Sequence, residues 1–188
     1  MKIGIIVGSV REGRAARTVA EWVQATADQR EEATFEIVDL ADFDLPMLTS
    51  PIIPGMANRQ YDDERVVRFG QAIDQYDGFV FVTPEYNHSI PGAFKNAFDS
   101  LAPEWMGKTV AFVSYGADGG IRAVEHWRSV VANFSMHAVR QQVALSLFTE
   151  LGQDGLQLQE RRAGELDVLV DQLVVATRAL VLQDQPVA

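Results

Sequence analysis

The chain contains no cysteine. It therefore forms no disulfide, holds no thiolate-bound zinc or iron–sulfur cluster, and has no cysteine nucleophile. His126 and His137 have no partners at the spacing of metal ligands, so we expect surface or core roles for both and predict no metal site. Any redox chemistry would have to come from a bound cofactor.

Basic residues are also scarce, because 16 lysines and arginines stand against 26 aspartates and glutamates, a net charge of −10. This balance repels the phosphate backbone of nucleic acids and the anionic surface of membranes. No run approaches the roughly 18 apolar residues of a membrane span, and the first apolar run stops at Gly8. We therefore expect a cytoplasmic protein without nucleic-acid or membrane partners.

The apolar residues that are present alternate between strand-like and helix-like spacing. With 188 residues and 47% hydrophobic side chains, the chain has the size and composition of a single domain spanning residues 1–188. Runs rich in β-branched residues and phenylalanine predict five strands, at residues 2–7, 34–39, 78–83, 109–115 and 138–143. Between these runs the apolar residues have helical spacing. Strands that alternate with helices predict a parallel sheet.

Differences among the runs predict where each strand lies. The first, third and fourth are apolar throughout, as expected of central strands covered on both faces, and the second partly alternates, which is typical of an edge strand. With helices on both faces, the prediction is a three-layer α/β/α domain. Two segments fit poorly: residues 46–60 predict a long loop, and residues 145–155 predict a connection or a small insertion.

Three loops at the carboxyl ends of predicted strands carry the candidate functional residues. In an open parallel sheet such loops converge where the strand order reverses, and ligands bind there. The first loop, residues 8–17, offers small residues for close approach, the Ser9 hydroxyl, a helix N-terminus, and the side chains of Arg11, Arg14 and Arg17. Cations at a helix N-terminus oppose the helix dipole, so these arginines predict a bound anion in a phosphate site.

The first loop matches neither of two common nucleotide-binding motifs. The Walker A pattern requires lysine and a hydroxyl residue where this chain has Arg14 and Ala15. The dinucleotide fingerprint requires a second glycine where this chain has Val10. Neither an ATPase nor a dinucleotide-binding domain of that type is predicted.

The two other loops favour contact with a flat ligand. The second, residues 83–92, has prolines on both sides of a polar tip that contains Tyr86, Asn87 and His88. The prolines restrict the backbone, which suits a rigid wall. The third, residues 114–120, contains three glycines that allow the backbone to approach a ligand closely.

Together these motifs resemble the NAD(P)H-dependent FMN reductase family. The resemblance rests on Gly8-Ser9-x-Arg11, on Pro84-Glu85-Tyr86-Asn87 with Ser89-x-Pro91-Gly92 and Lys95-Asn96, and on Ser114-Tyr115-Gly116-x-x-Gly119-Gly120. It covers residues 1–143, with the motifs in the same order and on the same predicted strands. The resemblance implies a flavodoxin-like fold with strand order 2-1-3-4-5. The family includes azo, quinone and chromate reductases.

The resemblance also implies roles for individual residues, with the flavin phosphate on the first loop and the isoalloxazine ring bordered by the other two. The residues concerned are Ser9, Arg11, Arg14, Ala16 and Arg17; Pro84, Glu85, Tyr86, Asn87 and Ser89; and Ser114, Tyr115, Gly116 and Gly119. One departure is Ala15-Ala16-Arg17, where many relatives have a serine or threonine. Backbone groups and Arg14 or Arg17 would then replace that hydroxyl.

The implied reaction is hydride transfer from NADPH or NADH, through bound FMN, to a small electron acceptor in a ping-pong cycle. The cofactor carries the chemistry, so no side chain is predicted to be catalytic. The amides of Tyr86, Asn87, Gly116 and Gly119 would stabilise negative charge on the ring. Relatives are generally dimers or tetramers, which implies a homodimer or homotetramer that associates through the third and fourth helices.

Two other functions stay open at this point. The acidic charge also fits a flavodoxin-type electron carrier, although flavodoxins typically hold the phosphate on a loop rich in serine and threonine without arginines. A non-redox module that binds phosphate or a nucleotide is the third possibility.

Other conspicuous side chains have simpler interpretations. The helical spacing of Trp22 and Trp127 predicts core positions, whereas Trp105 is interpreted as an aromatic at the rim of the site or in a subunit contact. The acidic run at residues 62–64 predicts a helix N-terminus. His88, in the second loop, is a candidate contact for the acceptor or the nicotinamide.

Overall fold

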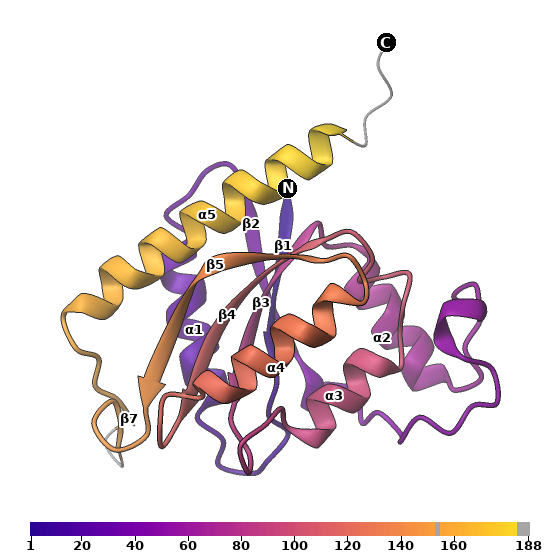
Figure 1. Ribbon diagram of the computed structural model, residues 1–188, viewed down its shortest axis with the longest axis horizontal. Helices are drawn as coiled ribbons and strands as arrows, with labels where there is room; N and C mark the ends of the chain where they lie inside the picture. Colours follow the sequence, from indigo (N-terminus) through magenta and orange to yellow (C-terminus); the bar gives the residue numbers. More distant parts are fainter. Residues whose placement is uncertain (153–154, 184–188) are drawn as a thin grey trace.

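The five predicted strands form one parallel sheet in the computed structural model, which describes residues 1–152 and 155–183 (Figure 1). The strands are β1 (Lys2–Val7), β2 (Thr34–Asp39), β3 (Gly78–Pro84), β4 (Thr109–Gly116) and β5 (His137–Ser146). Their order across the sheet is β2-β1-β3-β4-β5, which confirms the flavodoxin-like topology. The order reverses at β1 and β3, which pair with each other in parallel.

Helices cover both faces of the sheet and complete the predicted three layers (Figure 1). α1 (Ala16–Ala27) and α5 (Arg161–Gln183) pack on one face, and α2 (Glu64–Asp74), α3 (Gly92–Asp99) and α4 (Ile121–Ala132) pack on the other. α2 begins at the acidic run, as predicted, where the Asp63 carboxylate accepts from the Arg65 amide at 2.8 Å. Within the described ranges, no helix is long and apolar enough to cross a membrane.

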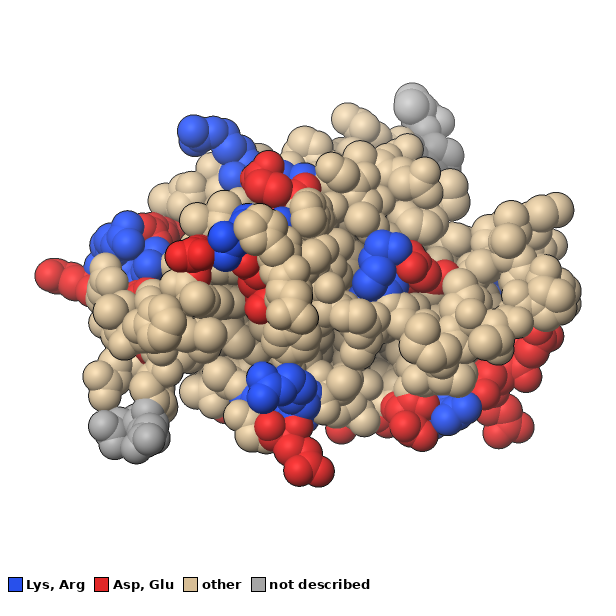
Figure 2. Space-filling view, turned by 60° about the horizontal axis from the view of Figure 1, so that its bottom comes forward, with Lys and Arg blue, Asp and Glu red and all other residues tan. Residues whose placement is uncertain are grey.

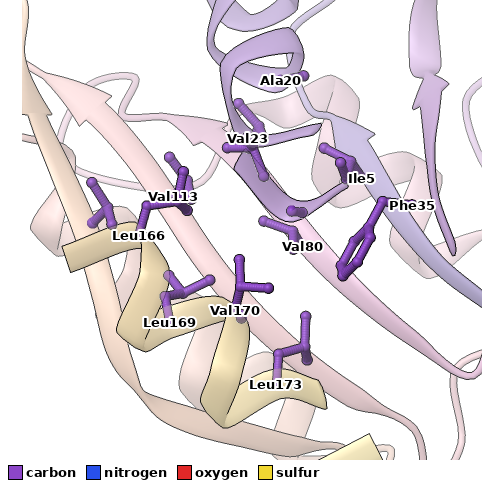
Figure 3. Packing of buried hydrophobic residues seen from close by; sticks show 14 of the residues in the cluster. Ile5, Ala20, Val23, Phe35, Val80, Val113, Leu166, Leu169, Val170 and Leu173 are labelled. Atoms are coloured by element: carbon purple, nitrogen blue, oxygen red, sulfur yellow. The ribbon is translucent and has the colours of Figure 1, made fainter. Parts of the chain in front are cut away.

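The sheet separates two hydrophobic cores of different composition. Under α1 and α5 the core consists largely of aliphatic side chains such as Val23, Val80 and Leu169 (Figure 3). Under the other three helices it is rich in aromatic rings, among them Phe81 and Phe98. Because both faces are covered, β1, β3 and β4 have continuous apolar sequences, whereas the edge strand β2 is only partly buried.

Trp105 belongs to the aromatic core, so its interpretation as a rim or subunit-contact residue was wrong. Its side chain is fully buried, its ring stacks on Phe98, and its indole nitrogen donates to the Phe98 carbonyl oxygen at 3.1 Å. Trp105 follows no helical spacing because it lies in the turn between α3 and β4, and this turn folds inward. Trp127 is fully buried, as predicted, and Trp22 is partly buried against the aliphatic core.

The two segments that fitted the pattern poorly take different forms. Residues 46–60 form a long loop with one short 3-10 turn, Pro54–Met56. The Asn96 side chain holds this loop, because it donates to the Pro46 carbonyl at 2.8 Å and accepts from the Leu48 amide at 2.9 Å. Residues 145–155 begin within β5 and continue into β6 (Leu151–Gly152), which pairs antiparallel with β7 (Gly155–Leu156). This segment is therefore part of a small inserted hairpin.

Gly8 connects β1 to the first loop at a point with no room for a side chain. Its amide donates to the Val82 carbonyl oxygen at 2.9 Å, which extends the pairing of β1 with β3. A Cβ atom here would overlap the Phe94 ring and lie 2.9 Å from the same carbonyl oxygen. The glycine therefore allows α3 to pack against the end of β1.

We predict that Gly8→Ala destabilises the protein by about 1–3 kcal/mol, because the added methyl group must displace Phe94 or the sheet. Gly164→Ala is the matched control. Gly164 lies within α5, and a Cβ atom added there has no neighbour within 4 Å. The Gly164→Ala substitution should therefore stabilise the protein by about 0.5–1 kcal/mol. Urea unfolding followed by circular dichroism measures both. Equal unfolding free energies for the two variants would contradict the packing argument.

Candidate functional site

The loops that leave β1, β3 and β4 meet at the carboxyl edge of the sheet, at the bottom of the view in Figure 1. A cavity of about 420 Å³ lies there, where the strand order reverses. Its lining residues are Ser9, Arg11, Gly13, Arg14, Ala15 and Thr18 from the first loop and α1; Pro84, Glu85 and Tyr86 from the second loop; Tyr115; and Leu147, Leu151, Gly152, Gly155 and Leu156 from the chain after β5.

Part of the predicted site lines this cavity, and the rest lies around it. The predicted residues on the lining are Ser9, Arg11, Arg14, Pro84, Glu85, Tyr86 and Tyr115. The predicted residues outside the lining are Ala16, Arg17, Asn87, Ser89, Ser114, Gly116 and Gly119. The structure thus brings all three loops to one cavity, although individual residues within them differ in their relation to it.

The arginines of the first loop have different surroundings. Arg14 donates from Nη2 to Asp39 Oδ2 at 2.7 Å, and Arg17 donates from Nε to Glu21 Oε1 at 2.9 Å. The chain's own carboxylates therefore offset both charges, and the argument that these arginines require a bound anion does not apply to Arg14 and Arg17. Arg11, on the cavity wall, has no ion-pair partner in the described part of the chain.

A partly unsatisfied set of donors remains on this wall. The Nε atom of Arg14 is buried and has no hydrogen-bond partner among the described residues. The first amides of α1 have no intrahelical acceptor, as in any helix, and no side chain caps them at Ala15. The Arg11 guanidinium and the hydroxyls of Ser9 and Thr18 belong to the same wall. Several donors with positive charge at a helix N-terminus fit a phosphate group.

The second loop ends in a tight two-residue turn. Tyr86 and Ser89 exchange backbone hydrogen bonds at 3.0 and 3.1 Å, and the residues between them, Asn87 and His88, have φ angles of 48° and 75°. Positive φ at both central residues is the geometry of a type I′ turn, which asparagine tolerates well. The Tyr86 hydroxyl lies 2.8 Å from the Ser9 hydroxyl, so the turn is connected to the first loop.

His126 supports the same turn from α4. Its Nδ1 atom lies 2.8 Å from the Ser89 hydroxyl oxygen, while the residue is exposed to solvent. The expectation of a surface or core role was right about exposure, but it did not include this contact with the second loop. His137 is exposed at the start of β5.

Glu85 connects the second loop to the third. Its carboxylate accepts from Arg122 Nε at 2.6 Å and from the Arg122 amide at 3.1 Å, and Arg122 also donates to Asp118 at 2.6 Å. The Glu85 amide donates to the Tyr115 carbonyl at 3.1 Å. The carboxylate on the cavity wall is therefore neutralised by a guanidinium and does not present a free negative charge to an anionic ligand.

The third loop is shaped by its own serine and glycines. Gly119 and Gly120 have φ angles of 73° and 74°, and the fully buried Ser114 hydroxyl donates to the Gly119 carbonyl at 2.7 Å. This hydroxyl is thus used within the loop. Tyr115 does line the cavity, and burial raises the pKa of its hydroxyl above the ordinary value.

Two parts of the cavity wall were missed by sequence reasoning. The hairpin after β5 supplies apolar lining, and its signal was the mirrored order of Leu151-Gly152 and Gly155-Leu156 around a two-residue gap. Thr18 supplies a hydroxyl just after Ala15-Ala16-Arg17, the stretch in which the family pattern places one. Backbone groups and arginines therefore need not replace that hydroxyl.

Comparison with known sequences decides the family. The sequence model of the NADPH-dependent FMN reductase family matches residues 1–150. The chain belongs to this family. The assignment made from the three loop motifs is confirmed, and with it the enzyme class: this is an oxidoreductase family whose cofactors are FMN and NAD(P)H.

Individual relatives agree with the assignment. The chain is 44% identical over 126 residues to an NAD(P)H-dependent FMN reductase of a Nectria species, a region that covers 65% of the chain and 63% of that protein. It is 39% identical over 146 residues to an NAD(P)H-dependent FMN reductase of Schizosaccharomyces pombe, covering 78% and 73%. The solved structure of FerB, a flavoenzyme NAD(P)H:acceptor oxidoreductase from Paracoccus denitrificans, matches with a TM-score of 0.75 and 24% identity over 95% of the chain and 97% of that structure. This last likeness concerns the fold alone.

On the face that carries the cavity, charged side chains form small separate groups. In Figure 2, basic side chains lie in small groups, most of them beside acidic ones, with broad uncharged areas between. Charges in such groups act over about a Debye length of 8–10 Å. The face therefore suits a small anionic group better than a long polyanion.

We predict that Arg11→Ala weakens FMN binding by roughly tenfold to a hundredfold, the value of one charged hydrogen bond of about 1.5–3 kcal/mol. Riboflavin, which lacks the phosphate, should bind the variant and the unaltered protein equally. Fluorescence titration of the apoprotein measures all four affinities.

Two further variants control this experiment. Arg178→Ala removes an exposed arginine of α5 that lies 3.6 Å from Glu32, and it should leave FMN affinity unchanged. Arg17→Ala should have a smaller effect than Arg11→Ala, because Arg17 pairs with Glu21 and does not line the cavity. Unchanged FMN affinity in Arg11→Ala would refute the assignment of Arg11 to the phosphate.

Proposed function

We propose that the protein is an FMN-dependent oxidoreductase that transfers a hydride from NADPH or NADH to a small acceptor, such as a quinone, a flavin, an azo compound or chromate. The observation that carries the proposal is a single cavity that joins a cationic helix N-terminus to a wall of aromatic and apolar side chains. A phosphate ester of a large flat ring needs both parts together. Relatives named NADPH azoreductase and quinone reductase support two of these acceptor classes.

In this proposal the first loop holds the FMN phosphate through Arg11, the free Nε of Arg14, and the hydroxyls of Ser9 and Thr18. The aromatic side chains Tyr86 and Tyr115, with Pro84, border the ring. The remaining residues of the predicted set act by shaping or anchoring the loops: Ala16, Arg17, Glu85, Asn87, Ser89, Ser114, Gly116 and Gly119.

When bound, FMN supplies the redox chemistry, because its ring accepts a hydride from a nicotinamide and releases it to an acceptor. The chain contributes binding and orientation, and no side chain is needed as a nucleophile. NAD(P)H and the acceptor use the same opening in turn, which gives ping-pong kinetics.

The backbone amides nominated to stabilise negative charge are not all available. The amides of Tyr86 and Gly119 already donate to the carbonyls of Ser89 and Gly116. A donor engaged in a turn must lose that bond before it can serve a ligand. Gly116 belongs to β4, pairs with Ser146 of β5 and accepts from the Leu147 amide at 3.0 Å, so its backbone groups are part of the sheet. Asn87 is therefore the amide that the proposal retains for this role.

A flavodoxin-type electron carrier is the second candidate. It would share this fold, and the net charge of −10 suits docking to a basic partner protein. The arginines of the first loop favour the reductase, because the phosphate loop of a flavodoxin typically contains serine and threonine but no arginine.

We predict that the purified protein binds FMN and absorbs as an oxidised flavin, that anaerobic NADPH or NADH bleaches it, and that a quinone restores the colour. Initial rates plotted in double-reciprocal form at several quinone concentrations should give parallel lines, because the two substrates never occupy the site together. Absorption spectroscopy and steady-state kinetics make these measurements.

Three other results would each change the proposal. Rapid reduction by a partner protein, with none by NAD(P)H, would identify a carrier. A colourless protein that fails to bind added FMN would identify a non-redox phosphate-binding module. Intersecting lines in the double-reciprocal plots would exclude a ping-pong mechanism, while the assignment as an oxidoreductase would stand.

We also propose that the chain acts as a single cytoplasmic domain, that its partners are small molecules, and that it forms a homodimer or homotetramer through α3 and α4. Exposed apolar side chains on the long loop after β2 support the association: Met47, Ile53 and Met56 lie on this loop, and Asn96 of α3 bonds to its start at Pro46 and Leu48. We predict a mass of two or four chains by light scattering. A mass of one chain at micromolar concentration would contradict this proposal.

A further inference from the structure

The Glu150 carboxylate is fully buried just beyond β5, next to the cavity hairpin. It forms a bidentate ion pair with Arg162 in the first turn of α5: Oε1 accepts from Nε at 2.7 Å, and Oε2 accepts from Nη2 at 2.9 Å. Arg162 is buried as well, and its Nη1 donates to Glu165 at 2.6 Å. Neither member of the pair lines the cavity, and the proposed reaction uses neither.

This one carboxylate joins three parts of the chain. Besides Arg162, it accepts from the Ser146 amide at 3.0 Å, at the end of β5, and from the Gln159 amide at 3.4 Å, just before α5. The Glu150 backbone carbonyl accepts from the Gln157 amide at 2.8 Å. These bonds close the base of the β6–β7 hairpin, between the end of the sheet and the start of the last helix.

The hairpin above this base forms a wall of the cavity. Leu151, Gly152, Gly155 and Leu156 are lining residues, and β7 lies beside α1, whose N-terminus carries the unsatisfied donors. A hairpin with two residues in each strand is not stable by itself. Its position therefore depends on the base and on the packing of its leucines against the aliphatic core.

The chemistry of the Glu150–Arg162 ion pair suits a role in positioning the hairpin. A buried ion pair adds little net stability over an apolar pair of similar size, whereas it demands a defined geometry from every donor that it engages. We propose that Glu150 and Arg162 are positioning residues of the cavity, which hold the hairpin against α1 and thereby set the affinity for the flavin. The flavin part of this proposal rests on the proposed function.

The decisive variant is the double substitution Glu150→Met with Arg162→Met, because it removes both ions and leaves no uncompensated buried charge. We expect it to fold with a lower melting temperature, because the amides of Ser146 and Gln159 lose the carboxylate that accepts from them. Hydrogen exchange in peptides that contain β6 and β7 should be faster. FMN affinity should fall about tenfold, because the hairpin would then be ordered only on binding.

Two single variants accompany it. Arg162→Lys keeps the charge but loses the planar bidentate geometry, so its exchange and affinity should lie between those of the unaltered protein and the double variant. Arg30→Met is the matched control, because Arg30 forms ion pairs with Asp167 and Asp171 on the same helix without lining the cavity. It should change neither hairpin exchange nor FMN affinity.

The possible outcomes separate the two proposals. Unchanged hairpin exchange in the folded double variant would overturn the anchoring role. Faster exchange with unchanged FMN affinity would overturn the link between hairpin and flavin. Failure of the unaltered protein to bind FMN would overturn the proposed function and the flavin link, and the exchange data would still decide whether the pair anchors the hairpin.

Discussion

Burial of the parallel sheet on both faces is the constraint on which the rest of the molecule depends. β1, β3 and β4 have almost no surface open to water, so polar chemistry is possible only at their ends. Their parallel direction brings three carboxyl ends to one edge, where the loops must share space. Gly8 packs closely against Phe94, so core packing fixes the point at which the first loop starts. No ligand is needed to fix it.

Ion pairs at this edge determine which charges a ligand meets. Arg14 and Glu85 both line the cavity, and each has a partner of opposite charge, Asp39 and Arg122. Pairing leaves Arg11 and the helix N-terminus as the sources of positive potential on the wall. An acidic protein can therefore hold an anionic group, because the Glu85 carboxylate on the cavity wall is paired with Arg122.

How much the sequence predicts depends on how local the cause is. The bounds of β1 and β2 agree with those predicted, because burial acts on consecutive residues and gives a visible period. The pairing of Arg14 with Asp39 leaves no such pattern, since the two residues meet only after β1 and β2 have paired. The burial of Trp105 was missed because this residue lies in a turn, where burial leaves no periodic pattern in the sequence. The loop motifs identified the family, but they did not show that Ser114 serves its own loop.

The hairpin after β5 shows why a cavity wall outside the sheet needs its own anchor. Sheet pairing does not position it, because it follows β5 and its described residues, 151–152 and 155–156, pair with one another and not with the five-stranded sheet. Apolar packing alone would hold it nearby in several similar arrangements, since hydrophobic contacts are not directional. A buried carboxylate accepts only from donors in defined places, and Glu150 has them in Ser146, Gln159 and Arg162. A wall that is ordered before the ligand binds lowers the entropy cost of binding. A residue that does not line the cavity can therefore still determine how tightly the cavity holds a ligand.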